Sequence, residues 1–359
     1  MVRAAVAQRV APAIAFGIRR LDGAGATWFA GREGPETDAP PTGPTTRFDL
    51  ASLTKALTTT TWVLRLVERA ALDLERPIGA LVDVEDPRLA VTPLWRLLNH
   101  TAGLPAHRRY YEGLGRSTRR SGRFDRARRS VRRMLSATAV DTEPGRAEIY
   151  SDPGFLLLQA IAERADGPLH ERWPDLPGHG PEQLHFRPST VRGEPASGYA
   201  PTEQCPLRGR LVRGEVHDEN AWIMGGVAGH AGLFGNLEAV LAQGRRWLHA
   251  LRGRSDALGI GPSLARAAID RRWMHPRGTR VLGWDTPTPG RSSSGRGFGR
   301  RAVGHLGFTG TSIWLDPDRG VVMALLTNRV SPSRSNTAIR RCRPRIHDAG
   351  WRWLGIRFT

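Results

Sequence analysis

The chain has 359 residues, which is short for three domains. Of these residues 40 % are hydrophobic and 24 % are charged, an ordinary composition for a globular protein. No stretch approaches the roughly 18 consecutive apolar residues of a membrane span, so we expect no membrane-spanning segment. The formal charge of +19 raises nucleic acid as a partner, but the basic residues are nearly all arginine and are spread along the chain, so we expect no nucleic-acid partner.

The first predicted elements are two strands, AIAFGI and ATWFAG, joined by the turn LDGAG. The apolar stretch at the start is short, contains Pro12 and continues directly into Arg19 and Arg20, so it does not resemble a signal peptide. We therefore expect the folded domain to begin almost at Met1 and the protein to be cytoplasmic. Export would require a start upstream of this one.

A helix is predicted from about Ala51. Apolar residues follow at three- and four-residue spacing as far as Ala71 and form one helix face. Ser52 then lies in the first turn, and Lys55 lies one turn later on the same side.

From about residue 73 to 214 the sequence predicts helices and loops. Thr92 and Asp152 each precede a proline, a pattern typical of a helix N-cap followed by a first-turn proline. The stretch 166–214 is rich in Pro, Gly and His, which is typical of surface loops. The arginine-rich run 116–133 indicates a solvated helix face rather than a phosphate-binding patch.

Strand and helix patterns return after residue 214. Asn236 is a predicted cap for the helix LEAVLAQGRRWLHAL, two strands follow in HLGFTGTSIWLDP and GVVMALLTNR, and a last helix spans much of 336–354. This order predicts an α+β fold. A helical domain, residues 61–214, would interrupt an α/β domain made of residues 1–60 and 215–359.

Lys55 is the only lysine, since the 53 Lys plus Arg residues are 52 arginines and this one residue. A serine hydroxyl is a poor nucleophile until a base takes its proton. A free lysine has a pKa of about 10.4 and needs a shift of roughly 3 units to be neutral at pH 7, whereas arginine would need about 6. Burial beside another cation can lower a lysine pKa that far. We therefore expect Lys55 to lose its proton near Ser52, the alternative being a leftover surface lysine.

Three short motifs carry a family resemblance. SLTK at 52–55 resembles the S-x-x-K of the serine β-lactamase and penicillin-binding-protein superfamily. YSD at 150–152 resembles the Y-x-N of the class C β-lactamases and their esterase relatives, and HLG at 305–307 resembles the third motif, K-T-G or H-x-G. The resemblance covers nearly the whole chain. It implies an antiparallel sheet flanked by helices, with an inserted all-helical domain, no cofactor and a small-molecule substrate.

The resemblance also implies a role for each site residue. Ser52 would be the acylated nucleophile, Lys55 would help to take its proton, and Tyr150 would act as general base and then as the acid that protonates the leaving group. The backbone N–H groups of Ser52 and Phe308 would form the oxyanion hole. Three further residues are expected to contact the substrate: Asp152, His305 and Gly307.

Departures from the family motifs bear on the substrate. The lysine and hydroxyl of K-T-G, which hold a substrate carboxylate, are replaced by His305, mostly neutral at pH 7, and by Leu306, which donates nothing. Asp152 replaces an asparagine and adds a negative charge, although it could equally be a helix cap. We therefore expect hydrolysis of small neutral esters or amides. Arg108 or Arg109 could restore anion binding.

Other functions stay open. They are β-lactamase or D-alanyl-D-alanine carboxypeptidase activity, a penicillin- or peptide-binding protein without turnover, and a nucleic-acid binder, which the intact Ser, Lys and Tyr argue against. The sequence does not indicate an oligomeric state.

The remaining histidines and both cysteines have plain structural interpretations. His217 to Glu219 and His230 could be metal ligands, but neighbours in a strand point to opposite faces, so we expect no metal. His100 is expected at a helix end. Cys205 and Cys342 could pair, but we expect two structural thiols.

Overall fold

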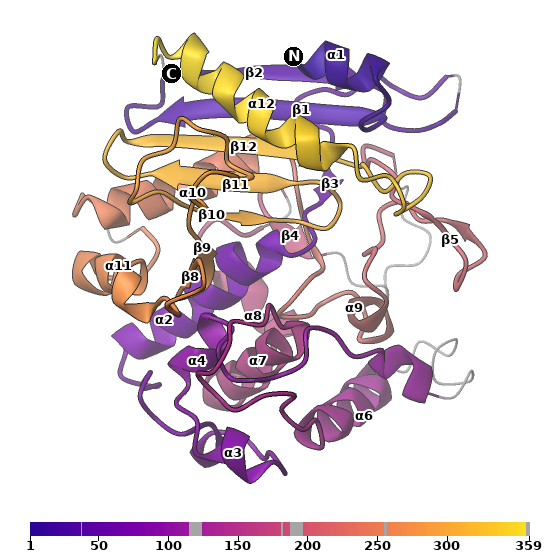
Figure 1. Ribbon diagram of the computed structural model, residues 1–359. Coiled ribbons are helices and arrows are strands. Elements are labelled where there is room, and N and C mark those ends of the chain that lie inside the picture. The colour runs from indigo at the N-terminus through magenta and orange to yellow at the C-terminus, as the bar shows by residue number, and fades with distance from the viewer. Residues whose placement is uncertain (37, 115–123, 181, 187–196, 255–256, 357–359) are drawn as a thin grey trace.

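A sheet of seven antiparallel strands organises the computed structural model, which describes residues 1–36, 38–114, 124–180, 182–186, 197–254 and 257–356 (Figure 1). The strands are β1 (Ala13–Arg20), β2 (Gly25–Gly31), β8 (Arg280–Val281), β9 (Trp284–Asp285), β10 (Val303–Leu306), β11 (Ser312–Asp316) and β12 (Val321–Thr327). Their order in the sheet is β2–β1–β12–β11–β10–β9–β8. The predicted α+β architecture with an antiparallel sheet is confirmed.

The neighbouring strands β1 and β12 come from opposite ends of the chain. Ile14 pairs with Thr327, and side chains along β1 alternate between two cores, with Ile14 and Phe16 in one and Ala13 and Ala15 in the other. Both faces of the sheet are therefore buried. This explains the uninterrupted apolar run VVMALLT of β12, all of whose residues are buried.

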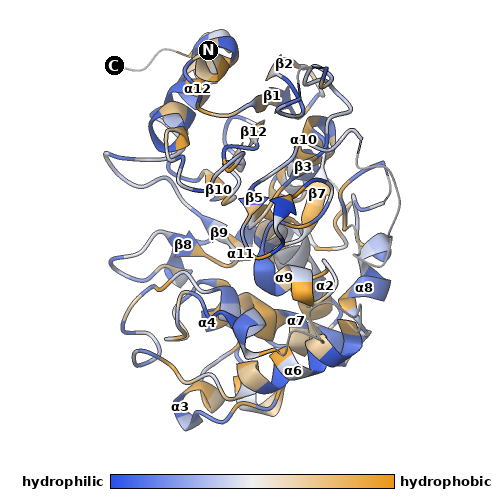
Figure 2. Cartoon of the chain, turned by 90° about the vertical axis from the view of Figure 1, so that its right-hand side faces the viewer, coloured by the Kyte–Doolittle hydropathy of each residue, from blue (hydrophilic) through white to orange (hydrophobic). Residues whose placement is uncertain are grey.

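Helices cover both faces of the sheet. Figure 2 shows α12 (Ile339–Trp353) on one side of β12 and α10 (Leu237–Leu251) on the other. The short helix α1 (Val2–Ala7) lies on the same side as α12, and its residues Val2 and Ala5 join the same core. Asn236 caps α10 as predicted, because its side chain accepts a hydrogen bond from the Ala239 N–H at 2.9 Å.

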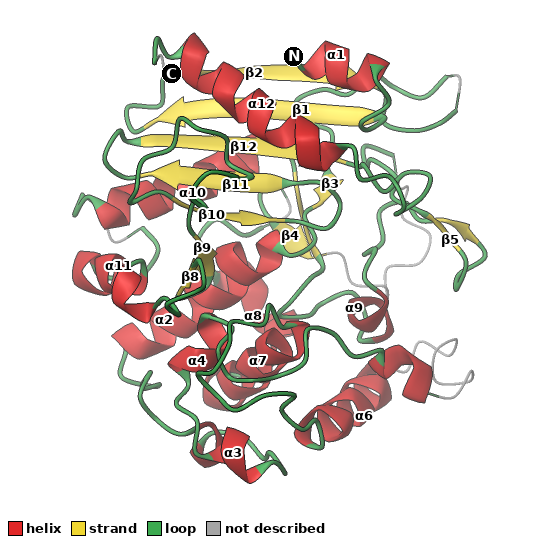
Figure 3. Cartoon of the chain, viewed as in Figure 1, coloured by secondary structure: helices red, strands yellow, loops and turns green. Residues whose placement is uncertain are grey.

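Most other helices gather toward the opposite end of the molecule from β1 and β2 (Figure 3). They are α2 (Thr61–Glu68), α3 (Pro87–Ala90), α4 (Trp95–Leu98), α6 (Phe124–Ser136), α7 (Asp152–Asp166), α8 (Leu169–Arg172) and α9 (Glu219–Ile223). Helix α11 (Pro262–Ala268) lies beside β8 and packs against α10. Single 3₁₀ turns are η2 (Ile78–Ala80), η3 (Tyr110–Gly113), η4 (Trp173–Asp175) and η5 (Arg271–Trp273). The predicted division into residues 1–60 with 215–359 and residues 61–214 stays a prediction.

Among the described residues, five short strands form two small sheets outside the main sheet. β3 (Phe48–Asp49), β7 (Leu233–Gly235) and β4 (His185–Phe186) form a three-stranded sheet, and β5 (Gln204–Cys205) pairs with β6 (Arg210–Leu211). Because β3 comes just before Ser52, pairing with β7 fixes the chain that enters the site: Phe48 pairs with Gly235 and Asp49 with Phe234.

Two of the predicted helix caps are wrong. Thr92 donates its hydroxyl to the Arg88 carbonyl at 2.7 Å, and α4 begins only at Trp95. For α7 the cap is Ser151, whose hydroxyl accepts from the Gly154 N–H, so the carboxylate of Asp152 is released for another partner. A cap side chain must fold back onto its own helix, and the sequence alone did not distinguish these neighbours.

The predicted solvated helix face is confirmed for the part of run 116–133 that the structure describes. Helix α6 begins at Phe124 and buries only Ala127, Val131 and Leu135, so its arginines lie on the remaining faces. Residues 115–123 lie outside the described residues. Within the described part of the chain, none of the helices combines the length and apolar character needed to span a bilayer.

Candidate active site

The segment that carries Ser52 follows an unusual backbone path. Ala51 has a φ of 48°, in the left-handed region that residues with a Cβ rarely adopt, and Asp49 holds it by accepting a hydrogen bond from the Ala51 N–H at 2.8 Å. Ser52 follows in a turn. Lys55 then begins a π-helix, η1 (Lys55–Thr60), that continues into α2. The predicted helix therefore begins later than Ala51 and ends earlier than expected, and its first turns are π-helical, as is frequent at functional sites.

Lys55 is fully buried in this segment. Its ammonium donates hydrogen bonds to three oxygens: Ser52 Oγ at 3.1 Å, Asp152 Oδ1 at 2.7 Å and the His230 carbonyl at 3.0 Å. Burial alone would lower the pKa of Lys55, but the negative charge of Asp152, together with an interaction with Tyr150, outweighs burial and raises the pKa above that of a free lysine. The expectation that Lys55 loses its proton is therefore wrong, because a carboxylate lies beside it where we expected a cation. The alternative of a surface lysine is also wrong.

Asp152 links Lys55 to a histidine. Its second oxygen, Oδ2, accepts a hydrogen bond from His107 Nδ1 at 3.1 Å. Burial would raise the pKa of Asp152, but the charge of Lys55 and the hydrogen bond from His107 hold that pKa far below its usual range. The same hydrogen bond raises the pKa of His107. The site thus contains a chain of polar groups that runs from Ser52 through Lys55 and Asp152 to His107 near the surface.

Tyr150 lies beside this chain of polar groups. The Lys55 Nζ atom is 5.0 Å from the centroid of the phenol ring, and the His100 ring centroid is 4.6 Å from it. His100 follows the end of α4, as predicted, and its Nδ1 atom accepts a hydrogen bond from the Ser151 N–H at 2.9 Å. His100 therefore supports the peptide next to Tyr150 rather than reacting itself.

The turn between β10 and β11 brings Phe308 to the nucleophile. Thr309 donates its hydroxyl to the Asp49 carbonyl at 2.7 Å, and Thr311 donates to the Leu50 carbonyl at 3.1 Å, so the turn is fastened to the chain that precedes Ser52. Within the described residues, neither the Ser52 N–H nor the Phe308 N–H donates to another protein group. Ser52 and Phe308 both line one cavity, so their backbone N–H groups stay candidates for an oxyanion hole.

Gly307 allows this close approach. A Cβ atom at this position would lie 2.0 Å from Thr311 Oγ1 and 2.6 Å from the Leu50 carbonyl oxygen, both far shorter than a tolerable contact. Any side chain would therefore separate the β10–β11 turn from the Ser52 segment. Gly307 acts on the site through backbone spacing, and it also lines the cavity.

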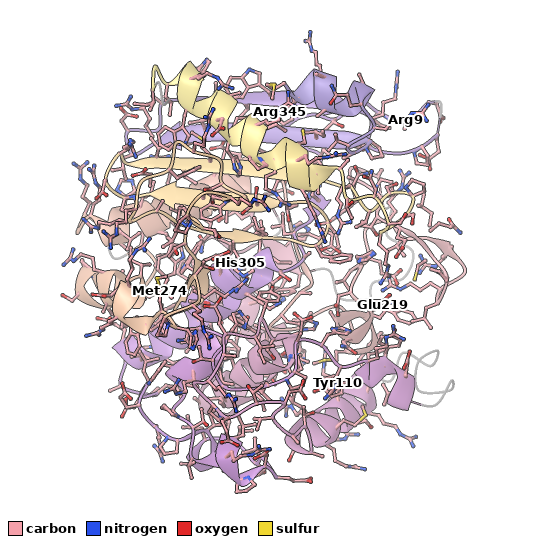
Figure 4. All side chains as sticks on the ribbon, viewed as in Figure 1. Arg9, Tyr110, Glu219, Met274, His305 and Arg345 are labelled. Atoms are coloured by element: carbon pink, nitrogen blue, oxygen red, sulfur yellow. The ribbon has the colours of Figure 1, made fainter. Side chains whose placement is uncertain are left out.

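His305 is a neutral residue of the site. Its Nδ1 atom bonds the Leu306 carbonyl at 2.9 Å, and because a carbonyl only accepts, Nδ1 carries the proton and Nε2 has the free lone pair. Burial, together with the charges of Lys55 and Arg280, lowers the pKa of His305 to about 3. The expectation of a neutral imidazole is supported. Figure 4 shows His305, a residue of β10, near the middle of the molecule.

The predicted residues surround one cavity of about 640 Å³. Ser52, Tyr150, Asp152, His305, Gly307 and Phe308 all line it, and buried Lys55 lies behind Ser52. A cavity of this size accommodates a small organic substrate. The structure thus brings together residues that lie as far as 256 positions apart in the sequence, from Ser52 to Phe308.

Arginines line the same cavity, and the sequence did not single most of them out. Three have carboxylate partners: Arg109 with Glu112, Arg280 with Glu148, and Arg334 with Glu203 and Glu219. Three others, Arg329, Arg340 and Arg343, have no ion pair with a described carboxylate. Burial and the charges of Arg329 and Arg340 lower the pKa of Arg343 to about 10. Arg108 does not line the cavity but pairs with Asp141.

The other histidines and cysteines do not form a metal or disulfide site in the described part of the chain. His217 Nε2 bonds Glu203 at 3.0 Å, and His230 Nε2 bonds Asp218 at 2.9 Å. No group of three or more potential ligands converges among the described residues. Cys205 and Cys342 are both free thiols, so the alternative of a disulfide is wrong.

Comparison with known proteins identifies the family. The model of the beta-lactamase family matches residues 1–342, which is most of the chain. The chain belongs to the β-lactamase family. It is accordingly a serine hydrolase of the β-lactamase and penicillin-binding-protein superfamily.

Curated family members resemble the chain over about four-fifths of its length. An N-acetylmuramyl-L-alanine amidase of Bacillus subtilis is 28 % identical over 319 residues, which cover 79 % of this chain and 68 % of that protein. A putative D-alanyl-D-alanine carboxypeptidase of Salmonella agona is 26 % identical over 316 residues, covering 79 % of this chain and 69 % of that protein.

Several solved structures share the fold. The crystal structure of SurE has a TM-score of 0.68 at 22 % identity and covers 99 % of this chain and 75 % of that one. A mutant of the simvastatin synthase LovD from Aspergillus terreus also has a TM-score of 0.68, at 18 % identity, covering 99 % and 98 %. The fold is therefore the β-lactamase/transpeptidase fold, as the resemblance implied.

Proposed function

We propose that this family member hydrolyses small esters or amides through an acyl-enzyme formed on Ser52. The observation that carries the proposal is the 3.1 Å hydrogen bond between the Lys55 ammonium and Ser52 Oγ, at a cavity that Ser52 and Phe308 line. A fixed ammonium beside a hydroxyl makes the hydroxyl proton easier to remove, because it stabilises the alkoxide that forms. The backbone N–H groups of Ser52 and Phe308 supply the charge stabilisation that a tetrahedral intermediate requires.

The proposed mechanism assigns the base to Tyr150. Because Lys55 holds its proton, Tyr150 as phenolate takes the proton from Ser52 Oγ while that oxygen bonds to the acyl carbon. The intermediate collapses, and the phenol gives the same proton to the departing oxygen or nitrogen. A water molecule then attacks the acyl carbon of the ester on Ser52 and loses its proton to Tyr150. As the bond between the acyl carbon and Ser52 Oγ breaks, Tyr150 returns this proton to Ser52 Oγ, and the acid product leaves.

Neutral substrates are our first candidates. The position that holds a lysine in the K-T-G motif is occupied here by a neutral, buried His305, and Leu306 beside it donates no side-chain hydrogen bond. Asp152 is already paired with Lys55 and His107. His305 and Leu306 therefore offer no charge to a substrate carboxylate, and Arg280, which lines the cavity beside them, is already paired with Glu148.

A second candidate is hydrolysis of an anionic peptide or lactam. Arg329, Arg340 and Arg343 line another part of the cavity and have no ion pair with a described carboxylate, so a substrate carboxylate would relieve their mutual repulsion. The curated names of the matched amidase and carboxypeptidase are consistent with such a substrate. A non-catalytic penicillin-binding protein would use the same cavity without turnover.

One set of assays separates these candidates. Ser52→Ala should abolish hydrolysis of p-nitrophenyl butyrate and labelling by a fluorophosphonate, with an unchanged melting temperature. We expect a higher kcat/KM for p-nitrophenyl butyrate than for nitrocefin. Labelling of Ser52 without turnover would instead support a binding protein.

A paired arginine variant tests the second candidate. Arg340 and Arg341 are exposed neighbours in α12, but only Arg340 lines the cavity. If wild type prefers nitrocefin, Arg340→Gln should lower kcat/KM for nitrocefin about tenfold and leave the butyrate ester unaffected, since one charge-assisted contact is worth roughly 1.5–3 kcal/mol. Arg341→Gln serves as the control and should change neither value.

A further inference from the structure

Two cations contact the ring of Tyr150. The Arg280 Cζ atom lies 5.0 Å from the ring centroid, the same distance as the Lys55 Nζ atom. Lys55 comes from η1 and Arg280 from β8, which are more than 200 positions apart in the sequence. A cation within about 6 Å of an aromatic ring is attracted to the ring, and more strongly so when the ring carries a negative charge.

Arg280 is held in place by Glu148. Its Nη1 atom donates to Glu148 Oε1 at 2.5 Å, and Glu148 Oε2 accepts from the N–H groups of Arg280 at 2.9 Å and Thr279 at 3.0 Å. The two side chains are mostly buried, with 24 % and 8 % exposure. The segment that leads to Tyr150 is thus clamped to β8, and the guanidinium cannot leave the ring without breaking several hydrogen bonds.

The charge of Arg280 also affects two histidines next to the Tyr150 ring. After burial, Arg280 is among the causes that lower the pKa of His100 and the pKa of His305, whose rings lie 4.6 and 6.0 Å from that of Tyr150. His305 is neutral, so β10 brings no positive charge to the site. The positive charges nearest the phenol therefore come from Lys55 and Arg280.

We propose that Arg280 is a positioning residue for the reaction, one that stabilises the phenolate of Tyr150 from β8. This proposal rests on the role of Tyr150 as base under the proposed function. In each half of the cycle the phenolate accepts one proton, from Ser52 or from water, and then releases it to the leaving group or to Ser52. Arg280 stays charged throughout and lowers the energy of the state in which the phenol has no proton.

The competing explanation is that Arg280 only clamps Glu148. The ionisable groups that face Tyr150 from the packed elements are Lys55 of η1, Asp152 of α7, His305 of β10, His100 after α4 and Arg280 of β8. Among them Arg280 can be changed without touching Ser52 or Lys55. If Arg280 acts through its charge, variants that keep or remove the charge at this position will differ in the ionisation of Tyr150. If Arg280 only holds Glu148 in place, they will not differ in this ionisation.

The test is ¹³C NMR of tyrosine labelled at Cζ, whose shift reports ionisation of the phenol. The chain has 4 tyrosines, and Tyr150→Phe identifies the relevant signal. In Arg280→Gln we expect the pH of half-ionisation to rise by about one unit, the lower end of the range for a charge at this distance, because Glu148 offsets part of the charge. The acidic limb of the kcat/KM profile should move by the same amount, and Arg280→Lys should restore most of both.

Two further variants sharpen the result. Glu148→Gln keeps the guanidinium and removes its counter-charge, so it should move half-ionisation of Tyr150 to lower pH. Arg47→Gln is the matched control, because Arg47 lies 5.7 Å from the Tyr199 ring and pairs with Glu182, outside the cavity. It should leave the Tyr150 signal and the pH profile unchanged.

The outcomes distinguish the two proposals. If Tyr150→Phe retains wild-type activity, Tyr150 is not the base and the proposed mechanism fails. If Tyr150→Phe is inactive but the Arg280→Gln and Glu148→Gln proteins titrate as wild type, the role of Arg280 is overturned and the mechanism stands. If Arg280→Gln does not fold, the direction of the shift in Glu148→Gln decides: a rise or no shift overturns the role of Arg280.

Discussion

The ammonium of Lys55 and the carboxylate of Asp152 form an ion pair of 2.7 Å, in which the lysine side chain has no exposed surface and the aspartate side chain has 18 %. Two buried charges of this kind depend on each other, since removing one leaves the other unpaired in a poorly solvated place. The pair keeps the lysine protonated next to Ser52. Under the proposed mechanism, Lys55 therefore stabilises the alkoxide of Ser52, and a different group takes the proton.

Asp152→Asn, which restores the residue of the Y-x-N motif, should destabilise the protein by about 3 kcal/mol at pH 7 because it leaves the ammonium unpaired. The folded-state pKa of Asp152 is depressed, so its stabilising contribution is complete above the unfolded pKa near 4 and is lost as the pH falls toward the folded value. Urea denaturation at several pH values should show the gap between variant and wild type shrinking by about 1.4 kcal/mol per pH unit below about pH 4. A gap that stays constant with pH would contradict the ion pair.

His107 should titrate at a higher pH than a free histidine. Its pKa is raised by the hydrogen bond to Asp152, against a smaller effect of burial. The imidazole Cε1–H signal in NMR, assigned with His107→Gln, reports this titration directly. In Asp152→Asn the signal should return toward the ordinary value near 6.5. An unshifted His107 in the wild-type protein would show that the contact is absent in solution.

Lys55→Arg should lower kcat/KM by a factor of about 100 or more, because general acid–base and electrostatic assistance contribute roughly 10²- to 10⁴-fold. The change keeps the charge but forces a larger, planar group into a fully buried space, so we also expect a loss of about 1–3 kcal/mol in stability. Steady-state kinetics with p-nitrophenyl butyrate and a thermal melt measure the two effects. Activity above a tenth of wild type would mean that the charge alone suffices.

Gly307→Ala should lower kcat by about 10²- to 10³-fold, the usual effect of losing one oxyanion donor. The added Cβ would meet Thr311 Oγ1 and the Leu50 carbonyl and push the Phe308 N–H away from Ser52. Gly43→Ala is a suitable control, because a Cβ there meets only the Pro41 carbonyl oxygen at 3.9 Å. If both variants have wild-type kcat, the Phe308 amide does not bind the oxyanion.

Much of the fold and the site follows from local patterns. Strands β1, β2, β11 and β12 and helices α7, α10 and α12 appear in the sequence as apolar runs with clear turns or caps. The three motifs selected side chains that the structure gathers around one cavity. The motifs could predict these side chains because each motif lies near the end of a helix or strand that faces the cavity.

Charges brought together by the fold could not be predicted in the same way. From the sequence we expected a lowered pKa for Lys55. The structure shows instead that Ser151 caps the helix and that Asp152 bonds to Lys55, and neither contact can be seen in the sequence. The π-helical turns of η1 could not be predicted either, because periodic apolar spacing does not distinguish π-helical from α-helical turns. Arg280 and Arg343 were two among 52 arginines until the structure placed them beside Tyr150 and the β10–β11 turn.

Because the protein has one lysine and that lysine is buried, it offers few sites to reagents that acylate primary amines. Apart from the α-amino group of the chain, Lys55 is the one primary amine, and in the folded state it is protonated, fully buried and hydrogen-bonded to three oxygens. An acylating reagent needs the neutral, accessible amine, so it reacts with Lys55 only when the structure around η1 opens. The rate of acylation at Lys55 thus records how often that part of the molecule unfolds, without the need for any introduced label.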